Sequence, residues 1–151
     1  MKNQQPPNRT LLSVLFLAGL LDLRSAAACG LQVTSAWIRE APPSATALAA
    51  YATLTNSGNE TLTITSVSAP VAALAQLHET TLKDGMVLMR MLSSLTIPAG
   101  GTMTLTPGGK HLMLTGIKGL PKAGEQVTIA FTDATGCVTH ADFKVRSTNS
   151  N

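Results

Sequence analysis

Two histidines and two methionines at fixed spacing are the residues of this 151-residue chain best suited to metal chemistry. Ten residues separate His78 from Met89, twenty-one separate Met89 from His111, and one separates His111 from Met113. Imidazole nitrogens and thioether sulfurs form a soft, neutral ligand set, which selects Cu(I) over hard cations such as Mg²⁺ or Ca²⁺. The set requires neither a carboxylate nor a cysteine. We therefore expect these four residues to bind one Cu(I) ion.

The first two candidate ligands flank a predicted β-hairpin whose turn signal is Asp84-Gly85. A loop over Leu82–Gly85 would place His78 opposite Met89, where both side chains reach one ion. A two-residue loop would instead place His78 opposite Met91. Because Met89 and Met91 share a face of their strand, the register of the hairpin decides which methionine is the better ligand.

The other two candidate ligands lie two residues apart on one predicted strand. His111 and Met113 therefore point the same way, and Pro107-Gly108-Gly109 forms the turn before them. Leu112 and Leu114 take the opposite face of that strand and are predicted to enter the core. One hairpin and one strand would then build the site together.

Short alternating segments separated by turn residues predict an all-β fold, a sandwich or barrel in a single domain. The alternation of apolar and polar residues is clearest in the segments 62–64, 102–106, 127–131 and 137–145. No segment has a sustained helical period. The Ala-rich segment Val71–Leu77 is where we expect at most one turn of helix.

Residues 1–28 have the features of a secretory signal peptide. Lys2 and Arg9 precede the apolar run Leu11–Leu21, and Ala26-Ala27-Ala28 forms a small-residue cleavage site. The apolar run is shorter than the roughly 20 residues that span a bilayer. We expect the leader to be removed and the mature protein to be periplasmic.

The remaining chain comprises a predicted domain, residues 29–146, and a flexible tail, residues 147–151. From residue 29 onward, eight basic residues face seven acidic ones, so the net charge falls from +3 to +1. This near-neutral part has no basic cluster and is not expected to bind nucleic acid. No Ser/His/Asp or Cys/His catalytic set is apparent, so we do not expect an enzyme.

Cys29 and Cys137 are the only cysteines and lie near the two ends of the mature chain. In an oxidising compartment, a disulfide between them is the default expectation. The alternative is a lipid on Cys29, which directly follows the cleavage site and would place the protein at a membrane. Ala26 stands where a lipoprotein signal usually has leucine, which favours the disulfide.

Two rival functions follow from the same residues. Cys137 and His140 offer part of a blue-copper site, but no methionine follows them, and strand alternation places them on opposite faces. A β-sandwich can also be a metal-free interaction domain, because the fold alone does not fix the function.

The four candidate ligands and their surroundings resemble the periplasmic copper chaperone family often called PCu(A)C. The pattern of that family is His, ten residues, Met, twenty-one residues, His, one residue, Met, and this chain matches it without a gap. Similar flanking segments extend the resemblance over roughly Ala36 to Phe131. They include 36–39, 50–51, 56–58, 77–80, 97–101 and 107–114.

The resemblance implies a cupredoxin-like Greek-key β-sandwich that binds one Cu(I) through His78, Met89, His111 and Met113. It also implies copper delivery to the CuA centre of cytochrome c oxidase, with a thiol-disulfide copper chaperone as a second partner. A role in copper storage or tolerance is the alternative. Some family members carry a His- and Met-rich tail that binds a further copper, and C-terminal to the four-residue set His140 is the only candidate for such a ligand in this chain.

Overall fold

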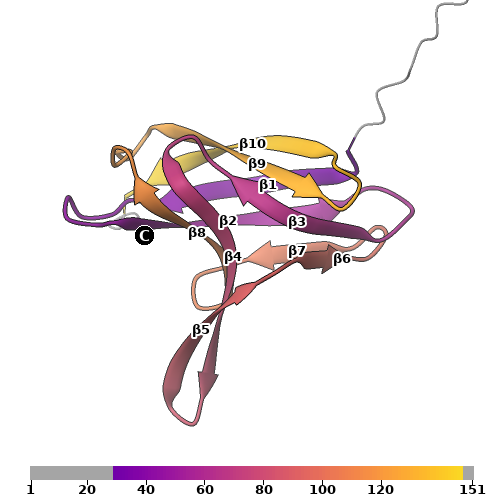
Figure 1. Ribbon diagram of the computed structural model, residues 1–151, viewed down its shortest axis with the longest axis horizontal. Coiled ribbons are helices and arrows are strands. Elements are labelled where there is room, and N and C mark those ends of the chain that lie inside the picture. The colour runs from indigo at the N-terminus through magenta and orange to yellow at the C-terminus, as the bar shows by residue number, and fades with distance from the viewer. Residues whose placement is uncertain (1–28, 148–151) are drawn as a thin grey trace, which may run out of the picture.

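Ten β-strands form the regular structure of residues 29–147, the part of the chain that the computed structural model describes (Figure 1). They are β1 (Leu31–Arg39), β2 (Ala47–Asn56), β3 (Leu62–Ser68), β4 (Ala72–Lys83), β5 (Met86–Leu92), β6 (Leu95–Ile97), β7 (Thr102–Leu105), β8 (Lys110–Ile117), β9 (Gln126–Asp133) and β10 (Val138–Arg146). Within this range, no helix is long and apolar enough to cross a membrane. The predicted signal peptide, residues 1–28, and residues 148–151 of the predicted tail lie outside it.

The strands join in the order β5-β4-β8-β2-β1-β10-β9-β3-β6, and β7 pairs with β2. A pairing between Val67 of β3 and Ala75 of β4 brings the two halves of this sheet together and closes it into a barrel. Strands β1 and β10 run parallel, with Trp37 opposite Lys144, and the other pairs are antiparallel. The predicted all-β sandwich or barrel is confirmed.

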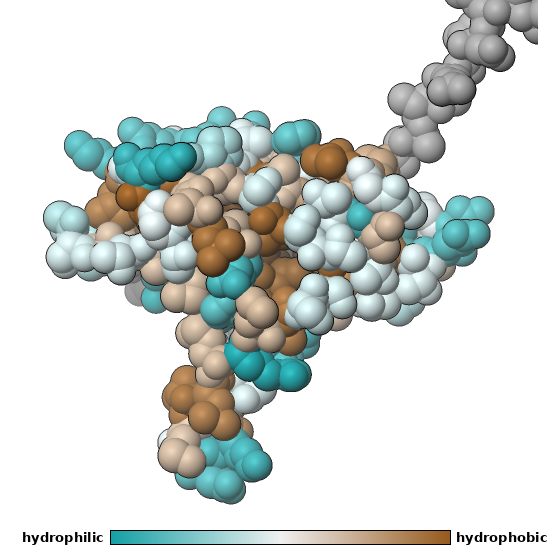
Figure 2. Space-filling model, viewed as in Figure 1, coloured by the Kyte–Doolittle hydropathy of each residue, from teal (hydrophilic) through white to brown (hydrophobic). Residues whose placement is uncertain are grey.

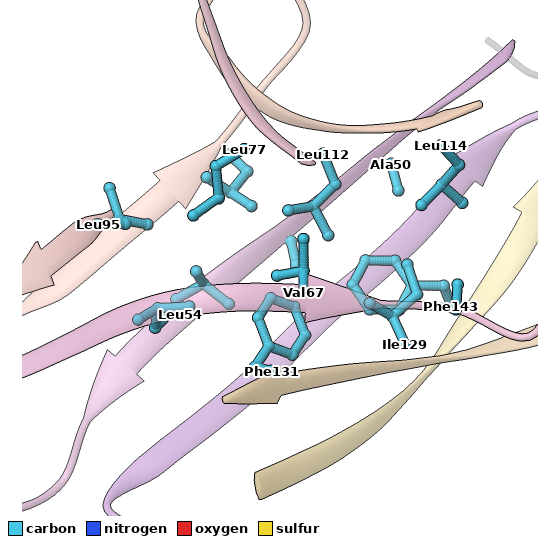
Figure 3. Close-up of a cluster of buried hydrophobic side chains, with 14 of the residues drawn as sticks. Ala50, Leu54, Val67, Leu77, Leu95, Leu112, Leu114, Ile129, Phe131 and Phe143 are labelled. Carbon is cyan, nitrogen blue, oxygen red and sulfur yellow. The ribbon is translucent and has the colours of Figure 1, made fainter. Parts of the chain in front are cut away.

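The core is filled by apolar side chains that alternate along the strands with outward-facing residues. Figure 3 shows Leu112 and Leu114 of β8 lying across from Ile129 and Phe131 of β9, and all four are buried. Fully burying such a side chain contributes about 1.5–3 kcal/mol. The burial of the two leucines fixes which face of β8 points outward.

Val71–Leu77 does not contain the helical turn that its alanines suggested. Strand β4 begins at Ala72 and continues through Lys83. It is hydrogen-bonded to β8, with Ala72 opposite Ile117 and Leu77 opposite Leu112. Pairing with a neighbouring strand and burial of Leu77 outweigh the helix propensity of alanine, since tertiary context overrides propensity.

A disulfide joins Cys29 to Cys137, as predicted, across a sequence separation of 108 residues. Cys29 lies two residues before the start of β1 and Cys137 directly precedes β10, so the bridge links two parallel strands at the same end. A bridge of this kind contributes typically about 2–4 kcal/mol, largely by restricting the unfolded chain. A sulfur held in a disulfide cannot also carry a thioether-linked lipid, so the structure favours the bridge over lipidation of Cys29.

The hairpin of β4 and β5 projects from the body of the sandwich (Figure 1). Strand β5 is the last strand at its end of the sheet, so one of its edges is unpaired among the described residues. Figure 2 shows hydrophobic surface along this projection. Its exposed large apolar residues are Leu82, Met86, Val87, Leu88, Met89 and Met91.

Candidate metal centre

The antiparallel pairing of β4 with β8 places His78 directly opposite His111. Their ring centroids lie 5.8 Å apart. The preceding residue of β4, Leu77, and its partner Leu112 on β8 are both buried in the core. Because side chains alternate along a strand, the two imidazoles must share the opposite face of the sheet. Two of the four predicted ligands are thus brought together across a sequence separation of 33 residues.

The backbone fixes the orientation of His111, whose side chain is 6% exposed. Its Nδ1 lies 3.1 Å from the carbonyl oxygen of Gly109. A carbonyl oxygen only accepts, so Nδ1–H donates and Nε2 keeps its lone pair. Metal-ligating histidines are commonly oriented in this way, with the second ring nitrogen donating to a carbonyl or carboxylate. His111 is therefore prepared to bind a metal through Nε2.

The ring of His78 is the part of this face whose bonding most needs an explanation. Both of its ring nitrogens are buried, and neither has a hydrogen-bond partner among residues 29–147. Leaving a buried polar group unpaired costs about 1–3 kcal/mol, so such groups call for an explanation. Burial lowers the pKa of His78, and the nearby His111 lowers it further. The ring is thus held neutral, which is the form that binds metal.

Met113 and Met89 lie beside His111 around one small pocket of about 200 Å³. Met113 is opposite Ala49 of β2, and small and apolar residues complete the wall. The pocket is lined by Ala47, Leu48, Ala49, Met89, His111 and Met113. His78 adjoins it through its contact with His111. All four predicted ligands therefore gather on one face of the sheet, and the residues present suit a soft cation.

The hairpin register differs from the one that would pair His78 with Met89. Asp84 and Gly85, with φ angles of 52° and 79°, form a two-residue turn, so Lys83 pairs with Met86. Positive φ at both central positions is typical of a type I′ turn, which Asp-Gly favours. This register places Met91 opposite His78, and Met89 opposite Thr80. Of the two registers considered, the two-residue loop is correct.

A second consequence of this register was not predicted from the sequence. Gln76, two residues before His78 on β4, donates from Nε2 to the sulfur of Met91 at 2.8 Å. Gln76 is itself opposite Met113. The sulfur of Met91 is thus a third thioether beside the four candidate ligands. The only sequence feature that indicated this position was the turn signal at Asp84-Gly85.

Aromatic side chains form the rigid flank of the site behind His111. The ring of Tyr51 lies 6.5 Å from that of His111, and Trp37 lies 4.6 Å from Tyr51. The guanidinium of Arg146 covers the Trp37 ring at 5.4 Å. Burial raises the pKa of Tyr51, partly offset by the charge of Arg39, so the phenol stays neutral. The two aromatic rings themselves are uncharged, and Tyr51 is the one that lies beside His111.

A charged cluster on the other face holds three strands together. Glu79 of β4 accepts from Arg90 of β5 at 2.6 Å and from Lys110 of β8 at 2.7 Å. Hydrogen bonds from Lys110 and then Arg90 lower the pKa of Glu79. Because Glu79 adjoins His78 and Lys110 adjoins His111, these ion pairs support the same register that brings the histidines together.

The blue-copper alternative does not fit the structure. Cys137 is in the disulfide with Cys29, so it has no free thiolate for a metal. His140 is exposed on β10, as the strand alternation predicted. Within residues 29–147, no group of three His, Cys, Asp or Glu side chains could hold a metal ion. Among these described residues, the two paired histidines therefore have no thiolate, carboxylate or third histidine beside them.

Comparison with known families identifies relatives over most of the chain. A family model described as LpqE-like, putative lipoprotein, matches residues 31–145. The putative lipoprotein Lxx21020 of Leifsonia xyli subsp. xyli is 39% identical over 107 residues, which are 69% of this chain and 63% of that protein. The chain thus spans less than two thirds of the length of this curated relative.

Solved structures share the fold. The copper-bound PCuAC domain from PmoF2 has a TM-score of 0.66 at 17% identity, over 78% of this chain and 93% of that domain. Apo-DR1885 from Deinococcus radiodurans is 33% identical with a TM-score of 0.62, over 99% of this chain and 95% of that protein. The same protein with Cu(I) is 36% identical with a TM-score of 0.63, over 85% of this chain and 87% of that protein. The cupredoxin-like fold and the family resemblance predicted from the sequence are confirmed.

The lowered pKa of His78 predicts a measurable pH dependence in the metal-free chain. His78 should titrate at lower pH in the folded chain than in the same chain unfolded in urea. The unfolded state then binds more protons between the two pKa values. Folding stability should therefore decrease as the pH falls below the ordinary histidine value of about 6.5, and should level off below the pKa of the folded state.

An NMR titration of the imidazole protons measures this directly, with His140→Gln used to assign the exposed histidine. Urea unfolding at a series of pH values supplies the stability. A His78 midpoint at or above that of the unfolded chain would contradict the environment described for this ring.

Proposed function

The chain belongs to the LpqE-like family and has the PCuAC-domain fold, and from this premise we propose that it is a copper(I) carrier of the cell envelope. One Cu(I) ion is the cargo, bound by His78, Met89, His111 and Met113. The description of the family and of its relative as putative lipoproteins supports an envelope location. The copper-bound states named for PmoF2 and DR1885 support the choice of metal.

The observation that carries the proposal is the pair of unpartnered nitrogens of His78 beside the correctly oriented His111. A buried imidazole with no hydrogen bond is destabilising unless it has another partner. A cation that accepts lone pairs from His78 and His111 would give the unprotonated nitrogen of each ring a partner. The sulfurs of Met89 and Met113 then complete a soft set suited to Cu(I).

This ligand set is suited to carrying copper and releasing it. Thioethers bind without losing a proton, so only the two imidazoles make binding sensitive to pH. Met113 is half-buried beside the core, whereas Met89 is 54% exposed on the projecting hairpin. A partner can therefore displace the Met89 sulfur first while the ion remains held by the inner ligands. Thiolates would bind Cu(I) as well but would be open to disulfide formation in an oxidising compartment.

The proposed acceptor is the copper-site subunit of cytochrome c oxidase, at its CuA centre, with a thiol-disulfide copper chaperone as the second partner. The four-residue pattern shared with the periplasmic copper chaperones supports this assignment. The protein acts by passing on a bound ion and not as an enzyme. Copper storage or tolerance is the competing role for the same binding site.

Titration of the purified chain with Cu(I) under anaerobic conditions tests the binding site. We expect one equivalent to bind, and His78→Ala or Met113→Ala to lower the affinity by more than about 100-fold, because the loss of an outer-shell partner alone costs 10–100-fold. Competition with a chromophoric Cu(I) chelator gives the affinity. His140→Ala, at an exposed histidine outside the site, is the matched control.

Equal affinities for the wild type, His78→Ala and His140→Ala would refute this site. No binding by the wild type would instead favour the metal-free interaction domain.

Oxidase assembly tests the proposed acceptor. A strain lacking the protein should lose most of its cytochrome c oxidase activity at limiting copper and recover it when copper is added. The wild-type gene should restore activity, whereas the gene for His78→Ala should not. Normal oxidase activity together with increased copper sensitivity would instead support the storage or tolerance role.

A further inference from the structure

Strand β5 presents a second thioether to the copper site. The two-residue turn at Asp84-Gly85 places Met91 directly opposite His78, and Met89 opposite Thr80. Directly opposed residues have Cβ atoms about 4.5–5.5 Å apart, whereas diagonal neighbours are about 7–8 Å apart. By register, Met91 is therefore nearer to His78 than Met89 is. The three residues His111, His78 and Met91 form one row across β8, β4 and β5.

The sulfur of Met91 already points along this face. It accepts a hydrogen bond from Nε2 of Gln76 at 2.8 Å, and Gln76 is opposite Met113. Met91 therefore belongs to the row that contains His78, and its sulfur contacts the neighbouring row, which contains Gln76 and Met113. A thioether is a weak hydrogen-bond acceptor, so this contact is easily replaced by a stronger partner. The side chain is also 58% exposed, which makes its sulfur accessible from outside.

Building on the proposed copper-binding function, we propose that Met91 is an exchange ligand that takes over the Cu(I) position of Met89. As the bond from Cu(I) to the Met91 sulfur forms, the bond to the Met89 sulfur breaks. Both ligands are neutral thioethers, so no proton or electron moves and the ion remains Cu(I). The exchange leaves the ion on the exposed side of His78, within reach of an incoming protein ligand.

A double-mutant cycle on β5 tests this proposal, with Cu(I) affinity as the readout. The variants are Met89→Leu, Met91→Leu and the double substitution, since leucine keeps a similar volume. Met86→Leu is the matched control, because Met86 is also exposed on β5 but lies on the other face, opposite Lys83. The cycle separates a contribution of the Met91 sulfur to Cu(I) binding from a contribution of the side chain to packing.

We expect Met91→Leu to lower Cu(I) affinity at least about tenfold further in the Met89→Leu background, because it removes the substitute sulfur. In that background the methyl carbon of Met91 should also shift on Cu(I) addition in an NMR spectrum of ¹³C-methyl-labelled methionine. An effect no larger than that of Met86→Leu in the same background, together with an unshifted Met91 methyl, would overturn the proposal.

The proposed copper-binding function and the proposed exchange role of Met91 can be refuted separately. If the wild type binds no Cu(I), or binds it independently of His78 and Met113, the proposed function is wrong. If the wild type binds Cu(I) through those residues and Met91→Leu behaves as the control does, only the exchange role is wrong.

Discussion

The pairing of β4 with β8 is the constraint on which the site depends. Leu77 and Leu112 are opposite one another and buried, so His78 and His111 must be opposite one another on the outer face. A shift of one residue would move the leucines out of the core and the histidines into it. The hydrophobic core therefore enforces the register that brings the two imidazoles together. The ion pairs of Glu79 on the other face support the same register.

The site combines a fixed part and an accessible part. His111 is held by Gly109 and backed by Tyr51, and Met113 lies on the same paired strand. The thioethers of β5, in contrast, lie on a hairpin that projects from the sandwich (Figure 1). A carrier needs both properties, because it must hold its ion firmly in transit and still offer it to a partner. Under the proposed function, the inner ligands would retain copper while the hairpin would determine its release.

Local sequence patterns predicted most of the fold and half of the site geometry. The i, i+2 spacing of His111 and Met113, with Leu112 between them, required only strand alternation and was correct. The pairing of His78 with His111 was beyond such reasoning, because it depends on how two strands distant in sequence align around a common core. Neither the contact of Gln76 with Met91 nor the unpartnered nitrogens of His78 can be read from spacing.

The helical turn suggested by the alanines of Val71–Leu77 was wrong, because that local preference was weighed without the neighbouring strand. Two loop lengths were considered for the hairpin, and only the four-residue loop would have placed Met89 opposite His78. Pairing with β8 keeps Ala72 and the residues that follow it extended. In the hairpin, the left-handed conformations of Asp84 and Gly85 limit the loop to two residues. The conformation of Val71–Leu77 and the register of the hairpin are thus seen only when the cross-strand pairs are known.

X-ray absorption spectroscopy of the Cu(I)-loaded chain identifies the atoms bound to copper. We expect both imidazole nitrogen and thioether sulfur neighbours, with two of each in the wild type. Met113→Leu should remove sulfur while leaving the imidazole scattering intact. A first shell without imidazole scattering, or one that Met113→Leu leaves unchanged, would contradict this ligand set.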